Sequence, residues 1–315
     1  MSPGPQGVWL VDKPPALTSH EAVQRARALL RTRQVGHAGT LDPMATGLLV
    51  LLVGEATKLS PFLSMERKRY QADICLGVST DSLDADGVLV EETPVPEELR
   101  RELAQGRNSE RLCRALEAER SRREQVPPAI SAIHIAGDRA HARVRRGEEV
   151  NLPPRPVRVI SLELLAVELL PRVVIRVELE VDKGYYVRSF GRDLGMALGV
   201  PAHLTALRRL ASGGFTLAEA TPLAPPPRLL SLEEVARRAL PVGVLSEQGA
   251  RRARQGQTLG PDDFLGAPPR GLAAWFEGER LLAVGESKEE RFRVLRGFSA
   301  GRLSAGLPRL PSLAP

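Results

Sequence analysis

The segment from Arg172 to Asp182 constrains the fold of this chain more than any other. Apolar and polar residues alternate along it, and the polar set includes Arg176, Glu178 and Glu180. The apolar set is Val173, Ile175, Val177, Leu179 and Val181. A period of two is typical of an antiparallel strand with one face on a core and the other toward solvent. The segment therefore predicts an antiparallel sheet.

Apolar periodicity predicts further elements on both sides of this strand. The expected helices cover 19–30, 96–124, 187–198 and 231–240, and the other expected strands cover 70–78 and 157–169. Thr18, with Glu21 three residues later, forms a capping box at the first helix. Three short segments near the C-terminus, 271–276, 280–285 and 291–296, are typical of a small β-barrel. With 315 residues, the chain is expected to hold one large and one small domain.

The charge balance favours an anionic partner. The chain has 44 basic and 38 acidic residues, a net charge of +6 and a pI of about 9.8, which points first to nucleic acid. A second explanation stays open, because only five of the basic residues are lysine and such a skew fits a GC-rich genome or life at high temperature.

Composition also excludes several classes. Two cysteines cannot form a disulfide framework or a four-cysteine zinc site, and five scattered histidines argue against a histidine-built metal site. No apolar run approaches the roughly 18 residues of a membrane span, and the N-terminus lacks a secretory pattern. Phosphate-loop and dinucleotide-binding motifs are missing. We therefore expect a reduced, cytoplasmic protein without ATP or dinucleotide chemistry.

The most informative motif is GHAGTLDPMATG, residues 36–47, inside a glycine-punctuated loop over 33–47. Pro43 pushes Asp42 toward an extended conformation, and the glycines permit tight turns around it. A carboxylate is thereby presented from a rigid loop. The simpler alternative is an ordinary turn in which Asp42 caps Ala45 or Thr46.

Two other motifs supply candidate partners for an anionic substrate. In DKGYYVRS, Arg188 falls in the first turn of a helix, where the helix dipole does not favour a cation, so an anionic partner is expected. Tyr70 begins a strand beside Lys68 and Arg69 and is a candidate platform for stacking a base. A surface arginine without a role and a tyrosine packed in the core are the respective alternatives.

Taken together, these motifs closely resemble the pseudouridine synthases of the bacterial tRNA uridine-55 (TruB) type. The motifs that carry the resemblance are VDKPPALTS (11–19), GHAGTLDPMATG (36–47), GEATKL (54–59), KRYQADICLGVSTDSLDADG (68–87), QVPPAISAIH (125–134), DKGYYVRSFGRDLG (182–195) and HLTALRRLASGGF (203–215). They cover about residues 8–240 in the family's order. The region 246–300 resembles the PUA domain, an RNA-binding barrel.

The resemblance implies an α+β fold, with a mixed, mostly antiparallel central sheet and flanking helices, followed by a small C-terminal β-barrel. The implied domains are a catalytic domain over 1–245 with an RNA-binding arm at about 125–156, the PUA-like domain over 246–300, and a flexible tail over 301–315. The implied activity converts uridine to pseudouridine at position 55 in the T arm of tRNA, with a possible accompanying role in tRNA folding. No metal, cofactor, membrane or obligatory protein partner is implied, and a monomer is expected.

Roles carry over residue by residue. The resemblance makes Asp42 the essential aspartate, paired with Arg188, and gives Tyr70 the stacking role and a part in removing the C5 proton. His37 would take the place of the flipped base, and Leu207 would line the pocket. The remaining expected substrate-binding residues are Lys13, Gly39, Thr40, Arg143 and Arg145.

Departures from the family pattern affect the arm and one turn. Ala16 stands where the family commonly has Gly, Ala38 replaces a Thr, and the arm lacks the family's aromatic residues in its stretches 130–134 and 141–145. Two rival functions stay open. One is a non-catalytic RNA-binding or RNA-folding protein, and the other is a related synthase that acts on ribosomal RNA with a guide RNA.

Overall fold

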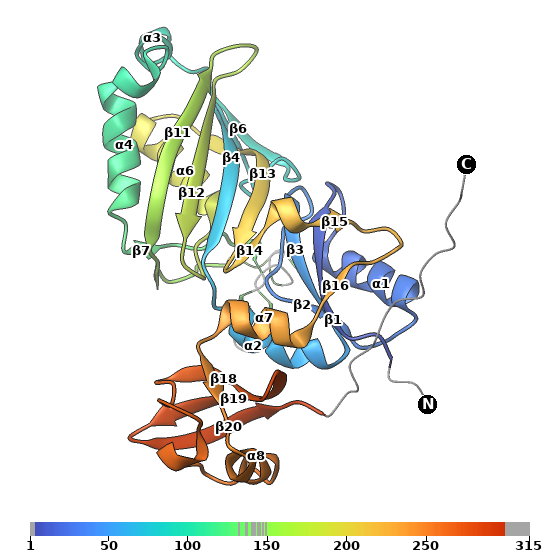
Figure 1. Cartoon of the computed structure of the whole chain (residues 1–315). Coiled ribbons are helices and arrows are strands. Elements are labelled where there is room, and N and C mark those ends of the chain that lie inside the picture. The colour runs from blue at the N-terminus through green and yellow to red at the C-terminus, as the bar shows by residue number, and fades with distance from the viewer. Residues whose placement is uncertain are drawn as a thin grey trace, which may run out of the picture.

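The structure is a computed structural model that describes residues 4–131, 133–135, 138–139, 143, 146, 148 and 150–299. Its centre is a ten-stranded sheet (Figure 1). Seven strands run in the order β11 (Val159–Glu168), β12 (Val174–Val181), β4 (Lys68–Leu76), β13 (Ala202–Ser212), β3 (Thr46–Val53), β1 (Gly7–Lys13) and β15 (Thr221–Pro222). The other three are β14 (Phe215–Thr216), β16 (Leu229–Leu230) and β2 (Val35–His37). Within the described sheet, β13–β3 and β1–β15 are parallel and the other pairings antiparallel, which confirms the expected mixed, mostly antiparallel sheet.

One half of the sheet consists of β11, β12, β4 and β13. The predicted alternation in β12 is confirmed, since Ile175, Val177, Leu179 and Val181 are buried and the residues between them are partly exposed. The helices α6 (Val187–Leu198) and α4 (Glu110–Arg120) pack on this half against β13 and β11, with α3 (Glu97–Leu103) beside α4. Most of the segment 96–124 is therefore helical, as predicted, and its last residue belongs to a short strand.

The other half contains β3 and β1, with helix α1 (Ser19–Leu30) beside β2. The capping box of Thr18 and Glu21 is present as predicted. Strand β3 is buried on both faces: Leu49, Leu51 and Val53 join one apolar cluster, whereas Leu48, Val50 and Leu52 join a second one. Burial on both faces explains its unbroken apolar sequence. The two halves of the sheet meet where β13 pairs with β3, at Arg208 opposite Thr46 and Arg209 opposite Gly47.

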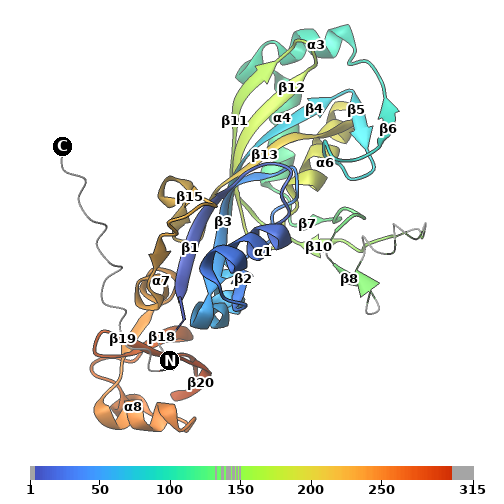
Figure 2. The ribbon, with the colours of Figure 1, turned by 90° about the vertical axis from the view of Figure 1, so that its right-hand side faces the viewer.

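A separate four-stranded sheet follows α7 (Leu232–Ala239) and lies beyond it at the bottom of Figures 1 and 2. Its order is β17 (Val242–Val244), β18 (Leu272–Glu277), β19 (Arg280–Lys288) and β20 (Arg291–Gly297), with α8 (Glu247–Arg254) packed on β19. The three predicted strands are thus present. The sheet also contains β17, which begins at Val242, and single bridges join Leu259 to Phe292 of β20 and Phe264 to Leu245 just after β17, so the segment between Leu259 and Phe264 contacts both edges of the sheet.

The remaining elements are short. Strand β5 (Val78–Thr80) pairs with β6 (Leu89–Glu92), and β8 (His134–Ile135) with β9 (Asp138–Arg139). The root of the expected arm is the pair β7 (Glu124–Gln125) and β10 (Arg155–Pro156), and β8 lies beyond this pair, away from the ten-stranded sheet (Figure 2). Arg145 and the expected tail over 301–315 lie outside the described residues. No helix in the described part of the chain has the length and apolar character needed to cross a membrane.

Candidate active site

The Asp42 loop joins β2 to β3 and is anchored to the first residue of α1. Ser19, the first residue of α1, donates its hydroxyl to the Leu41 carbonyl at 3.0 Å and accepts the Leu41 N–H at 2.8 Å. The Ala45 N–H donates to the main-chain carbonyl of Asp42, 3.1 Å away. The Asp42 carboxylate instead faces an arginine, so the alternative of a simple side-chain cap on Ala45 or Thr46 is not what the structure shows.

Arg209 braces the loop from β13. This side chain is fully buried, and its guanidinium donates to three carbonyls, those of Leu48 at 2.7 Å, Gly39 at 3.1 Å and Thr40 at 3.3 Å. A planar guanidinium with five donors suits such a fork of carbonyls. Gly39 and Thr40, expected to bind substrate, therefore turn their carbonyls toward the protein.

Lys13 also supports the loop. It is fully buried at the end of β1, and its ammonium donates to the carbonyls of Leu17 at 2.6 Å, Pro14 at 2.9 Å and Pro43 at 3.2 Å. Burial lowers its pKa to about 8, although the nearby Asp42 charge opposes this. These three bonds use all three ammonium donors. The side chain thus holds the main chain at Pro43, and the expected contact of Lys13 with substrate stays a prediction.

Arg188 brings the acidic groups together. It is 5 % exposed, lies in the first turn of α6, and donates Nη1 to the Ser82 carbonyl at 2.8 Å. Its Nη2 donates to Asp42 Oδ1 at 3.2 Å, and its Nε lies 3.0 Å from Asp42 Oδ2 and 3.6 Å from Asp84 Oδ2. The guanidinium thus meets both oxygens of Asp42, which fixes the direction of the carboxylate.

Burial and the neighbouring charges act in opposite directions on the pKa of Asp42. Burial raises the pKa of Asp42 above its ordinary value, Arg188 lowers it, and the neighbouring Asp84 raises it. The side chain of Asp42 keeps 32 % of its surface exposed, so a substrate can reach it. Arg188 is therefore the group that favours an ionised, accessible carboxylate here.

The root of the arm is fastened to the segment that carries Arg188. The Gln125 side chain is buried and accepts the Tyr186 N–H at 2.9 Å while donating to the Tyr186 carbonyl at 3.1 Å. One residue on, the Val126 carbonyl accepts from Ser189 Oγ at 2.8 Å and from Arg192 Nη2 at 3.2 Å. The arm and the start of α6 thus form one hydrogen-bonded unit.

Tyr70 and Leu207 lie on adjacent strands, β4 and β13. Tyr70 pairs in register with Arg209, and both Tyr70 and Leu207 are buried in the same apolar cluster as Leu41. Both side chains thus belong to the apolar core that Leu41 also joins. Core packing of Tyr70 is compatible with this burial, so its stacking role stays a prediction.

His37 is half-buried on β2. Its pKa is lowered by burial and by the charge of Arg209, which favours a neutral ring. Arg143 lies outside the Asp42 loop, in the arm, with its Nε 2.6 Å from Glu148 Oε2. The roles of both residues toward a substrate stay predictions. Among the described residues, no group of three or more His, Cys, Asp or Glu side chains is placed to hold a metal ion.

Three supporting residues were not singled out from the sequence. Arg209 had a signal, because it lies two positions after Leu207 and a strand period of two places both on one face. Asp84 and Gln125 had none, since each meets its partner only through contacts across more than sixty residues of sequence.

Comparison with known proteins agrees with this geometry. The family model for the N-terminal domain of the TruB family pseudouridylate synthases matches residues 27–187. Proteins named tRNA pseudouridine synthase B are 44 % identical in Nocardia farcinica, covering 90 % of both chains, and 43 % identical in Mycobacterium sp. strain KMS, covering 92 % of this chain and 96 % of the relative. The protein of that name in Thermus thermophilus is 38 % identical and covers 93 % and 98 %.

Solved structures show the same fold. A Cbf5-Nop10-Gar1 complex contains a chain with a TM-score of 0.68 and 23 % identity, matching 94 % of this chain and 85 % of that one. A second match, an H/ACA RNP bound to a substrate RNA containing 2′-deoxyuridine, has a TM-score of 0.66 and 21 % identity over 94 % and 86 %. The expected fold class is thus confirmed. On the family model and the curated relatives, the chain belongs to the TruB family and is a pseudouridylate synthase.

Proposed function

We propose that this enzyme isomerises uridine 55 in the T arm of tRNA, in the cytoplasm, with Asp42 as the essential carboxylate. The observation that carries the proposal is the contact of both Asp42 oxygens with Arg188 on a loop braced by buried cations. Relatives named tRNA pseudouridine synthase B support tRNA as the substrate. The uridine-55 assignment rests on the motif resemblance.

The reaction needs a carboxylate at a fixed place. The C1′–N1 bond breaks and a C1′–C5 bond forms, while a proton leaves C5 and N1 gains one, so atoms and electrons balance without another reactant. Asp42 acts by attack on C1′, by addition to C6 or by proton abstraction that gives a glycal, and each route requires it ionised and aimed. Arg188 supplies both conditions.

The base must leave its stack before the glycosidic bond is reached, at a cost of a few kcal/mol. Tyr70 and Leu207 receive the flipped base and His37 fills the gap in the RNA. In this proposal Tyr70 also assists removal of the C5 proton. Basic residues of the arm, such as Arg143, hold backbone phosphates, which is a sequence-independent contact.

The test is Asp42→Asn, which keeps size and polarity but removes the charge. The variant should bind unmodified tRNA and release no tritium from C5-labelled uridine. Retained turnover would refute the assignment. Purified wild-type protein, given tRNA alone, should form pseudouridine at position 55 without a guide RNA or protein partner. A requirement for a guide would instead favour the ribosomal RNA alternative.

A further inference from the structure

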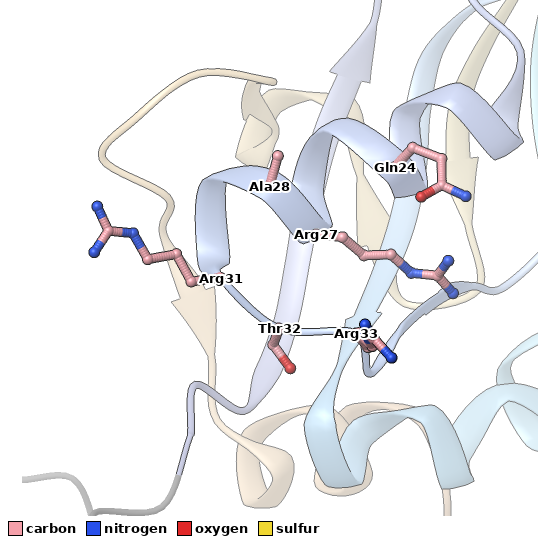
Figure 3. A pocket seen from close by; sticks show the side chains of 6 residues that line it. All are labelled: Gln24, Arg27, Ala28, Arg31, Thr32 and Arg33. Carbon is pink, nitrogen blue, oxygen red and sulfur yellow. The ribbon is translucent and has the colours of Figure 1, made fainter.

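A hollow of about 610 Å³ opens at the C-terminal end of α1, away from Asp42. It is lined by Gln24, Arg27, Ala28, Arg31, Thr32 and Arg33 (Figure 3). In this view Arg27 and Arg33 extend to one side of the Thr32 turn and Arg31 to the other. Guanidinium groups therefore stand on both sides of this turn.

These three arginines differ from Arg114 and Arg120 on α4. In α4, Arg114 and Arg120 face glutamates of their own helix, at 3.5 and 2.9 Å. Within the described part of the chain, no carboxylate lies within 4.0 Å of Arg27, Arg31 or Arg33. Arg31 and Arg33 are also exposed. Arg27 donates Nη2 to the Val35 carbonyl at 3.0 Å, whereas the charges of Arg31 and Arg33 are left for a partner outside the described chain.

The backbone conformation of Arg31 also favours a function for its side chain. Arg31 ends α1 in the left-handed region, with φ of +50°. Glycine adopts this conformation at helix ends without steric cost, whereas a residue with a side chain does so at a cost. An arginine at a position where glycine would fold more easily suggests a use for its side chain.

The hollow is within reach of an RNA seated at Asp42. Helix α1 begins at Ser19, which anchors Leu41, and its 12 residues span about 18 Å. Strand β2 then returns from the hollow to His37, four residues after Arg33. If His37 enters the RNA, the RNA backbone next to it passes along the edge of the protein that β2 and the end of α1 form.

We propose that this arginine hollow, Gln24 to Arg33, binds backbone phosphates of the substrate RNA. The inference rests on the proposed function for the identity of the RNA. Arginine is well suited to phosphate because its planar fork matches the phosphate oxygens. Such contacts carry no base specificity and release counterions, so they weaken as salt rises.

The test compares two double variants of equal charge change. Arg31→Gly with Arg33→Ala removes two charges from the hollow, and the glycine suits the left-handed position. Arg101→Ala with Arg114→Ala removes two exposed charges from the surface of α3 and α4. The affinity of each for an unmodified tRNA transcript is measured over a series of potassium chloride concentrations, with thermal melting to check folding.

We expect the hollow variant to bind tRNA at least tenfold more weakly at low salt, without a lower melting temperature. The slope of log K against log salt should become shallower by about 1.4–1.8, from roughly 0.7–0.9 for each of two lost phosphate contacts. The control pair should change affinity less than twofold. Equal weakening in both pairs, or an unchanged slope, would overturn the inference. Tight binding by the wild-type protein without turnover would instead count against the proposed function alone.

Discussion

Removing the charge of Arg188 is expected to move the acid limb of the pH–rate profile toward higher pH. Each route available to Asp42 needs it ionised, so activity is present above its pKa and lost as the pH falls through that pKa. Burial raises the pKa of Asp42 and Arg188 opposes this. In Arg188→Met the opposing charge is gone while Asp84 remains, so the pKa of Asp42 rises further.

The size of the shift follows from the contact. At 3.0 Å between Arg188 Nε and Asp42 Oδ2, with an effective dielectric constant of about 20, the attraction is about 5 kcal/mol. Because a third of the Asp42 side chain is exposed, solvent screens part of it. A neighbouring opposite charge typically shifts a carboxyl pKa by about 1–3 units, or about 1.4–4 kcal/mol. We expect a shift of the acid limb in that range.

Arg188→Lys is the matched control, because it keeps the charge and loses the fork. Its acid limb should stay within about half a unit of the wild type, since the charge is retained, while the maximal rate falls because Asp42 is no longer aimed. The assay is single-turnover tritium release from saturating tRNA over pH 5–9. An unshifted limb in Arg188→Met, or equal limbs in both variants, would contradict the reasoning.

Three further outcomes follow from the supports of the site. Arg209→Met removes charge-assisted hydrogen bonds to the loop carbonyls, each worth about 1.5–3 kcal/mol. The variant should have a lower urea midpoint and a lower turnover rate. Full activity would show that the loop does not need this support. Gln125→Ala should slow the single-turnover rate at least tenfold at saturating tRNA, because Tyr186 and the adjoining Arg188 lose their anchor; equal rates would dissociate the arm from the site. Ala16, with φ of +56°, should gain about 0.5–1 kcal/mol in unfolding free energy on change to Gly, since a left-handed L-residue is strained; a lower urea midpoint would disprove this.

Local patterns predicted the local structure. The alternation along 172–182 and the capping box before residue 19 depend on neighbours in sequence, and both were confirmed. The apolar run over 48–53 does not by itself distinguish a strand from a helix, because a strand covered on both faces has no alternation to display. Three strands of the C-terminal sheet were predicted from their own segments, whereas β17 and the bridges at Leu259 and Phe264 depend on pairings that no single segment reveals.

The same distinction between local pattern and long-range contact applies to the residues of the site. Asp42 could be singled out from its own loop, but its pairing with Arg188 spans 146 residues and came from the resemblance rather than from local pattern. Lys13 was assigned to the substrate through the resemblance, because its own segment does not reveal its surroundings. The structure buries it, since the carbonyls of two separate turns converge on its ammonium.

The second apolar cluster has a consequence for how the protein comes apart. Val50 of β3 and Val235 of α7 pack in one continuous core with Phe276 and Leu281 of the C-terminal sheet. The domain built on the ten-stranded sheet and the C-terminal sheet therefore share one apolar core, and more than a linker joins them. A chain truncated after Leu245 would expose this face of β3 to water. We expect the truncated protein to aggregate or to unfold at a lower temperature. The intact protein should unfold in a single cooperative transition.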